Sequence, residues 1–336
     1  MTTYKEINGT NIEAVSTDPA NPVTGQVWYN TTDNVVKGLG QTTAGAWSTG
    51  GNLNSAKRSV FTAGTQTAAL AAGGSNDDTP AIFATTELYN GSAWTEVNDL
   101  NVAKFQGGTA GTQTSALAFA GRTPPTVATN ESWNGTSWAE VADLNKARHG
   151  LGGAGISNTS ALCFGGFDPV TFPTPTGGRL TLTESWNGSS WTEVNDLNTG
   201  RTDMASGHGT ATSALSSGGN AVTGITGVTE SWNGTSWTEV ADLNTARGGS
   251  GSAGADNTSG LVFGGTPPTT GKTEEWNGSG WTEVADMATA RTNLNGALRG
   301  TTSASLAVGG NVPPITAATE EWNGAGSPLV QTFTDS

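Results

Sequence analysis

Short apolar runs separated by polar turns recur along the chain. Residues 115–120 alternate large and small apolar side chains, as expected for an inner strand that is packed on both faces. Such runs are followed by a Glu-x-Trp segment, an Asn-Gly turn and a Ser-Trp-Thr-Glu-Val segment. Asn-Gly favours a type I′ hairpin, because both central residues of that turn need a positive φ angle. The pattern therefore predicts an all-β protein built from antiparallel strands and tight turns.

These elements form a repeat whose markers each occur six times. The first aromatic residue recurs at intervals of 44, 53, 46, 44 and 46 residues, and it is Tyr89, Trp133, Trp186, Trp232, Trp276 or Trp322. The second aromatic residue is Trp47, Trp94, Trp138, Trp191, Trp237 or Trp281. The basic residue is Lys57, Lys104, Arg148, Arg201, Arg247 or Arg291. A small pair ends each apolar run, at residues 73–74, 120–121, 165–166, 218–219, 264–265 and 309–310. Intervals of this length are typical of β-propeller blades.

The incomplete repeats at the two ends complement each other. Trp47 has no Glu-x-Trp-Asn-Gly segment directly before it, and the last such segment, at residues 320–324, has no second Trp after it. We expect the strand around Trp47 to complete the last four-stranded blade, because such a closure leaves no sheet edge unpaired. The sequence thus predicts a closed six-bladed propeller over residues 43–326, preceded by a small β arm at 1–42 and followed by a tail at 327–336.

The order of these markers resembles the kelch repeat over residues 47–324. The resemblance implies a propeller of four-stranded antiparallel blades. It says little about activity, because kelch propellers serve as binding platforms, scaffolds and, in some cases, oxidases. The chain departs from the kelch pattern by Trp-Asn-Gly in place of the commoner Tyr-Asp turn and by its low charge.

Composition narrows the function further. Charged residues make up 12% of the chain, and 28 acidic residues against 14 basic ones give a formal charge of −14. Six of the basic residues belong to the repeat, so no clustered cationic surface for nucleic acid is expected. No apolar run is long enough to cross a membrane, and residues 1–5 lead into polar sequence rather than a signal peptide. We expect neither nucleic-acid binding nor membrane insertion.

A residue found in every repeat is expected to be structural. Each repeated Trp can bury about 200 Å² between blades, and stacking of an exposed Trp on a glycan is the alternative. Half-buried charges need partners, so the basic residues are expected to form fixed polar pairs. A ring of cations lining a channel for an anion is the alternative reading. The repeated acids are interpreted in the same way, as members of fixed polar pairs or of hydrogen bonds between a blade and its connector, and they are Glu87, Glu131, Glu184, Glu230, Glu274 and Glu320.

Candidate catalytic groups are few. A copper oxidase of kelch type would need His and Tyr ligands, but the only His residues are His149 and His208, and Tyr89 takes the place of a core Trp. The Trp-Asn-Gly turn resembles the Asp-box of six-bladed sialidases, where it is a structural turn, and no Tyr nucleophile is evident in the repeats. Cys163 lies in an apolar run and is expected to be buried. We expect no enzyme activity, no cofactor and no metal site.

Binding specificity is expected in the loops between the second and third strands of each blade, where the repeats differ. The longest of these loops begins at residue 167. It carries the best candidate contact residues, which are Phe167, Asp168, Phe172, Pro173 and Pro175. As an alternative, these Phe side chains simply cover the top of a blade.

Residues 25–30, Gly-Gln-Val-Trp-Tyr-Asn, resemble a short β-hairpin motif of bacteriophage tail-fibre and other virion proteins. The resemblance implies a virion structural protein, with Val27, Trp28 and Tyr29 as candidate anchoring residues towards other virion proteins. Because residues 1–5 do not begin a signal peptide, we expect it to be made in the host cytoplasm. The propeller would then be a decoration or a tail-associated adhesin for a host-surface glycan or protein, and self-association stays open. The alternatives are a secreted or cell-surface bacterial carbohydrate-binding propeller and an inactive relative of a propeller enzyme.

Overall fold

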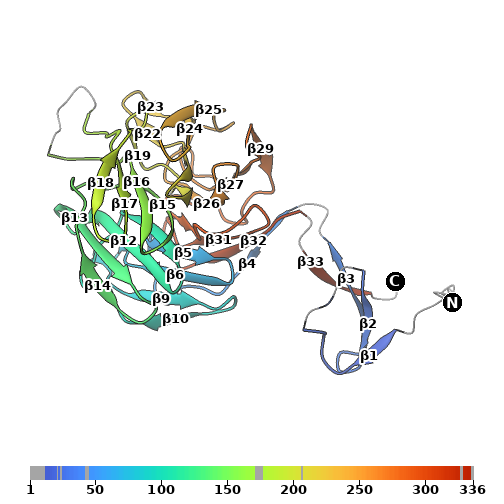
Figure 1. Cartoon of the computed structure of the whole chain (residues 1–336). Coiled ribbons are helices and arrows are strands. Elements are labelled where there is room, and N and C mark those ends of the chain that lie inside the picture. Colours follow the sequence, from blue (N-terminus) through green and yellow to red (C-terminus); the bar gives the residue numbers. More distant parts are fainter. Residues whose placement is uncertain are drawn as a thin grey trace. The chain divides into compact units, whose positions relative to one another are not determined.

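The computed structural model describes residues 12–20, 22, 25–41, 45–170, 177–205, 207–325 and 328–333. Its regular elements in these ranges are β-strands, which confirms the all-β prediction. The chain divides into two compact units (Figure 1). We call residues 46–323 the large unit, and residues 1–45 together with 324–336 the small unit.

The large unit contains six four-stranded antiparallel sheets, numbered here in chain order. Sheet 1 consists of β5 (Phe61–Thr65), β6 (Ala68–Ala72), β9 (Thr86–Tyr89) and β10 (Trp94–Val97). Sheet 2 consists of β11 (Gly108–Thr112), β12 (Ser115–Arg122), β13 (Thr126–Trp133) and β14 (Trp138–Val141). Sheet 3 consists of β15 (Gly152–Ser157), β16 (Ser160–Phe164), β17 (Thr183–Trp186) and β18 (Trp191–Val194).

The other three sheets repeat this plan. Sheet 4 consists of β20 (His208–Thr210), β21 (Ser213–Ser217), β24 (Thr229–Trp232) and β25 (Trp237–Val240). Sheet 5 consists of β26 (Gly251–Asp256), β27 (Ser259–Phe263), β28 (Thr273–Trp276) and β29 (Trp281–Val284). Sheet 6 consists of β30 (Asn295–Gly296), β31 (Ala304–Val308), β32 (Thr319–Asn323) and β4 (Ala46–Thr49). Short strands lie in three of the connecting segments, namely β7 (Ser75–Asn76) and β8 (Ala81–Ile82) in sheet 1, β19 (Arg201–Thr202) before sheet 4, and β22 (Asn220–Ala221) and β23 (Gly224–Ile225) in sheet 4.

Sheet 6 joins strands from opposite ends of the large unit. Trp47 of β4 lies opposite Trp322 of β32, the pairing that the register of the repeat markers predicted. The first strands of the six sheets also contact one another in chain order, and β30 of sheet 6 contacts β5 of sheet 1. Multiple four-stranded antiparallel sheets in this arrangement are compatible with a β-propeller.

The hairpins at the Asn-Gly positions differ from the predicted type I′ turn. Trp133 pairs with Trp138, so the loop between them has four residues. Gly135 has a φ of 93°, whereas Asn134 does not adopt positive φ. Instead, the side-chain oxygen of Asn134 accepts hydrogen bonds from the backbone N–H groups of Thr136 and Ser137, both at 2.9 Å. The Asn side chain therefore stabilises the turn as a hydrogen-bond acceptor. The left-handed backbone conformation is needed only at the Gly that follows it.

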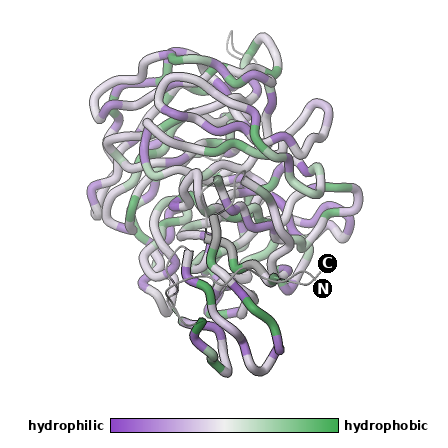
Figure 2. Tube along the Cα trace, turned by 90° about the vertical axis from the view of Figure 1, so that its right-hand side faces the viewer, coloured by the Kyte–Doolittle hydropathy of each residue, from purple (hydrophilic) through white to green (hydrophobic). Residues whose placement is uncertain are grey.

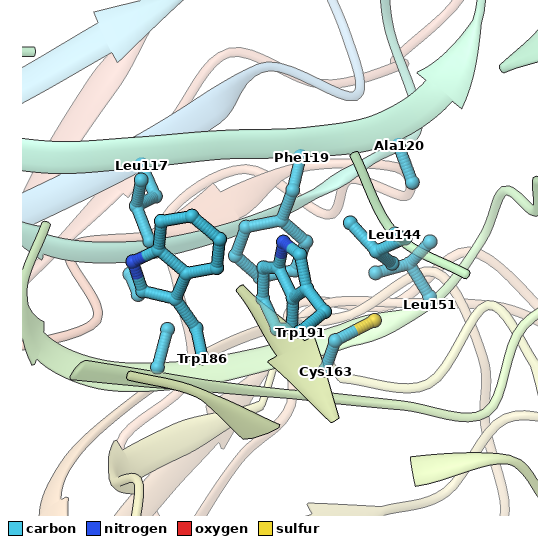
Figure 3. Packing of buried hydrophobic residues seen from close by; sticks show 10 residues of the cluster. Leu117, Phe119, Ala120, Leu144, Leu151, Cys163, Trp186 and Trp191 are labelled. Atoms are coloured by element: carbon cyan, nitrogen blue, oxygen red, sulfur yellow. The ribbon is translucent and has the colours of Figure 1, made fainter. Parts of the chain in front are cut away.

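The hydrophobic core lies largely between neighbouring sheets. In one cluster, Phe119 of sheet 2 meets Trp191 of sheet 3 edge to face, with ring centroids 5.0 Å apart (Figure 3). Cys163 packs in the same cluster and is fully buried, as predicted. Truncating a buried Trp of this kind costs about 3–5 kcal/mol. The large unit nevertheless consists mainly of residues of intermediate hydropathy, with short apolar and polar stretches between them (Figure 2).

The small unit is a four-stranded sheet of order β1-β2-β3-β33. Its strands are β1 (Glu13–Val15), β2 (Val27–Asn30), β3 (Val35–Gln41) and β33 (Pro328–Phe333). β1 and β2 are parallel, and β2 and β3 form the hairpin expected from the Trp-Tyr-Asn motif. The sequence suggested only a tail after residue 326, but β33 pairs with β3 over six residues. The whole large unit is thus inserted between two neighbouring strands of the small sheet.

Candidate functional site

The six repeated cations form buried ion pairs with the six repeated Glu residues. The N···O distances lie between 2.8 and 3.3 Å, and each of these side chains is at most 5% exposed. In sheet 4, Arg201 pairs with Oε1 of Glu230 at 3.0 Å, while Oε2 accepts the backbone N–H of Asn198 at 2.7 Å. Burial lowers the pKa of Arg201, and Glu230 opposes this shift. These cations are enclosed and partnered, so the arrangement fits the structural role and offers no cation-lined channel.

Four of the six Trp residues at the second aromatic position also bind a neighbouring sheet. The indole N–H donates to a Thr hydroxyl in four cases, from Trp47 to Thr273, Trp94 to Thr319, Trp138 to Thr86 and Trp237 to Thr183. Five of the six second aromatic residues are at most 8% exposed, and Trp47 is half-buried. Their ring faces are covered by protein, which leaves little surface for stacking on a glycan.

A ring of six backbone hydrogen bonds joins the six sheets. Its members lie two residues after the repeated cations and have φ angles between 52° and 63°. Each backbone N–H donates to the C=O of the preceding member at 2.7 to 3.2 Å, and the first member, Ser59, donates to the last, Asn293. We call this the six-residue ring, which consists of Ser59, Gln106, Gly150, Asp203, Gly249 and Asn293. Sequence reasoning missed it, although the fixed spacing from the cation was a usable signal.

The six-residue ring lines a small cavity of about 50 Å³. Apolar side chains including Leu151, Met204 and Leu298 form another part of the wall. Asp203 is the single charged residue among the described lining residues. Burial raises the pKa of the Asp203 carboxyl, while the nearby Arg179 and Arg58 oppose the shift.

The predicted contact loop is described only in part. Phe167 pairs through its backbone with His149, and their rings meet edge to face at 5.3 Å. Asp168 is 2% exposed and forms an ion pair with Lys146 at 2.6 Å. Val170 is 87% exposed. The other candidate contact residues, Phe172, Pro173 and Pro175, lie outside the described residues.

The predicted anchoring residues lie on β2 of the small sheet. Trp28 is fully buried, and its indole N–H donates to Asp18 at 3.0 Å, which makes it a core residue rather than a surface contact. Tyr29 is half-buried, and its hydroxyl donates to Asn34 at 2.5 Å. Val27 is also half-buried. The exposed large apolar side chains described on this unit are instead Ile12, Val330 and Phe333.

Burial shifts the pKa values of the two His residues and of the single Cys. Burial lowers the pKa of both His149 and His208 to about 4. Burial also raises the pKa of the Cys163 thiol to about 12, so the thiolate nucleophile is not favoured. Within the described ranges, no group of three or more His, Cys, Asp or Glu residues could hold a metal ion.

Comparison with known proteins gives no family for this chain: no family model matches it, and no curated protein matches it. The described residues contain no helix that is long and apolar enough to cross a membrane. The functional argument therefore rests on the repeat, the two-unit organisation and the chemistry of the sites above.

Proposed function

We propose that the six sheets are the blades of one closed, kelch-like β-propeller. The six-residue ring supports closure, because its hydrogen bonds form an unbroken series that includes a bond between sheets 1 and 6. The indole of Trp94 in sheet 1 also donates to Thr319 in sheet 6. The pairing of β4 with β32 supports the idea that the strand around Trp47 completes the last blade.

We further propose that the protein is a non-enzymatic structural protein of a bacteriophage virion, which displays the propeller on the particle surface. One observation carries this proposal: the large unit is an insertion between β3 and β33, two paired strands of a small sheet. A domain inserted in this way is held through two chain connections. The small sheet is then the attachment module, and the propeller is the displayed module.

The displayed propeller acts by binding rather than by catalysis. His208 and Cys163 are fully buried and His149 is half-buried, so these three side chains offer little access to a substrate. The loops between second and third strands carry exposed apolar residues, which are Ile82, Val170, Val222 and Ile225. These loops suit contact with a host-surface glycan or protein, as a decoration or as a tail-associated adhesin.

The small unit attaches the protein to other virion proteins. Its exposed Ile12, Val330 and Phe333 provide apolar contact surface. A homo-oligomer assembled through this unit is compatible with the same surface. The net charge of −14 opposes any role in packaging nucleic acid.

The test is quantitative mass spectrometry and electron microscopy of purified particles from the source culture. We expect a fixed number of copies per particle, with antibodies against the large unit labelling one region of the head or tail. If the protein is absent from particles and occurs free in the medium or on cells, the virion proposal is wrong. A secreted or cell-surface carbohydrate-binding propeller would then be favoured, and a glycan-array screen of the full chain would examine it.

A further inference from the structure

All six members of the six-residue ring line one small cavity. Four members carry a side-chain oxygen, and these are Ser59, Gln106, Asp203 and Asn293. The other two are Gly150 and Gly249, which flank Asp203 in the order of the ring. The ring's backbone N–H and C=O groups are all used by its own hydrogen bonds. The backbone N–H groups of the ring are therefore not free to donate to a ligand, and an anion in the cavity would find no donor among them.

Two of these side chains carry oxygens without a hydrogen-bond partner among the described residues, and the Gln106 oxygen is also buried. Oε1 of Gln106 is buried and accepts no hydrogen bond from a described residue. Likewise, no described residue donates a hydrogen bond to the Asp203 carboxylate. Leaving a buried acceptor unsatisfied costs about 1–3 kcal/mol, and more for a charged group. An oxygen-seeking ligand would remove this cost.

The two glycines keep the space beside these oxygens open. A Cβ atom on Gly150 would lie 2.2 Å from the hydroxyl oxygen of Thr202 and 2.9 Å from Oδ1 of Asp203. One on Gly249 would lie 2.7 Å from the hydroxyl oxygen of Thr292 and 3.0 Å from Oδ1 of Asn293. A side chain at either position would press on a ring oxygen. Both glycines also have positive φ, so they serve the ring backbone as well.

We propose that the six-residue ring binds one calcium-sized divalent cation, with the Asp203 carboxylate, the amide oxygens of Gln106 and Asn293 and the Ser59 hydroxyl as its ligands. A cavity of about 50 Å³ admits an ion with a few waters, whereas pockets for small organic ligands measure about 300–1,000 Å³. Carboxylate and amide oxygens completed by water are the ligands that calcium takes. Mg²⁺ fits less well, because it demands a rigid octahedron and gives up its waters reluctantly.

The single carboxylate sets the strength of this site. With one charged ligand, we expect an affinity in the range of extracellular calcium modules, roughly 0.1–1 mM. Arg58 and Arg179 weaken the attraction between a cation and the Asp203 carboxylate, although neither lines the cavity. Arg58 is held in an ion pair with Asp77, and Arg179 donates to the backbone and side-chain oxygens of Asn220.

The experiment uses the purified full chain in calorimetric titrations with CaCl2 and MgCl2 at fixed ionic strength. We expect saturable binding of one Ca²⁺ per chain, preferred over Mg²⁺. Thermal unfolding should shift upward by roughly 2–4 °C at a calcium concentration ten times the dissociation constant. Absence of saturable binding up to about 10 mM Ca²⁺, well above the affinity expected for such a ligand set, overturns the proposal.

Two variants distinguish calcium binding at the six-residue ring from calcium binding at exposed carboxylates of the outer strands. Asp203→Asn keeps the shape and tolerates the left-handed backbone but removes the charge, so affinity should fall at least tenfold. Glu193→Gln removes one exposed carboxylate from β18 and should leave affinity unchanged. Equal binding by wild type and Asp203→Asn would show that calcium binds elsewhere, which contradicts the proposal.

A second variant decides the matter if Asp203→Asn does not fold. Gln106→Met removes the buried, unsatisfied oxygen while keeping the length of the side chain. If Gln106 is a ligand, calcium affinity falls severalfold. If it is not, affinity is unchanged and the variant is as stable as wild type or more stable, because an unsatisfied acceptor has been removed. That second result overturns the proposal.

Discussion

The repeated ion pairs and the six-residue ring follow opposite rules. The ion pairs present nearly the same chemistry in every sheet, a buried Lys or Arg against a buried Glu. Two residues further along the chain, the ring positions hold Ser, Gln, Gly, Asp, Gly and Asn, with a common backbone angle and no common side chain. Repetition therefore marks the parts that hold the sheets together. Variation marks positions that are free to acquire a ligand.

The sheet contacts also contain two exceptions that test this distinction. Inner strands carry Ala63, Ala110, Ala154, Ala253 and Ala297 at one position, where sheet 4 has His208. At the interface between sheets 2 and 3, Asn130 stands where four other sheets place a Thr that binds a Trp.

Breaking one repeated ion pair should have the largest effect. Arg201→Leu leaves Glu230 fully buried without its cation, and we expect a loss of about 3–5 kcal/mol in the free energy of unfolding. Chemical denaturation measures this loss. Lys272→Met is the control, because it removes a half-exposed pair with Glu283 and should cost less than about 1 kcal/mol. Equal losses for the two variants would contradict a structural role for the buried pairs.

Restoring the repeat at His208 should change the dependence of stability on pH. The pKa of His208 is lowered to about 4 because the imidazole is fully buried. In the unfolded chain the imidazole takes up a proton as the pH falls through its ordinary value near 6.5, whereas the folded protein does so only near 4. Stability is therefore lost between these two values as the pH falls, by up to about 3 kcal/mol from this residue.

The matched variant combines His208→Ala with Gly260→Ala. Gly260 stands where sheets 1 to 4 have Ala, and a Cβ there would lie 2.3 Å from Nε2 of His208, so both residues must change together. We expect thermal or chemical unfolding between pH 7 and 4 to show a smaller loss of stability than in wild type. His149 remains in both proteins and cancels in the comparison. Identical pH profiles would show that His208 does not control acid lability.

The smallest expected effect concerns Asn130. Its side-chain oxygen and the indole N–H of Trp191 are both buried without hydrogen-bond partners among the described residues. Asn130→Thr introduces the hydroxyl that binds Trp in other sheets and should stabilise the protein by about 0.5–1.5 kcal/mol. The control is Thr183→Val, which removes the equivalent hydrogen bond from Trp237 and should lower the free energy of unfolding. Chemical denaturation of the two variants should therefore show changes of opposite sign. Destabilisation by Asn130→Thr would contradict this account.

The sequence was most informative where the repeat is strict. The positions of Trp47 and Trp322 predicted that two strands far apart in the chain share one sheet. The first repeat lacks the segment that the last repeat has, and the last repeat lacks the second Trp that the first repeat has, so these two incomplete repeats complete each other. The basic residues and Glu could be paired for a similar reason, since buried charges require partners. Burial of Cys163 followed from the apolar run around it.

Other features could not be read in this way. β33 carries no marker of the repeat, and its pairing with β3 depends on contacts across almost the whole length of the chain. The six-residue ring was hidden because backbone conformation, rather than residue type, defines its members. The Asn-Gly turns were placed correctly but assigned the wrong geometry, since the Asn side chain stabilises the turn without a left-handed backbone.

The measurement that tests closure of the six sheets most directly is a cross-link between the first and last strands of the large unit. Ala46 and Asn323 lie opposite each other, so Ala46→Cys with Asn323→Cys should form an intramolecular disulfide under mild oxidation. Mass spectrometry of the unreduced protein should then show these two strands joined, with Cys163 as the remaining free thiol. The control pair, Ala46→Cys with Asn277→Cys in the sheet 5 hairpin, should stay reduced. If Ala46→Cys with Asn323→Cys remains reduced, or links only separate molecules, the closed arrangement is contradicted.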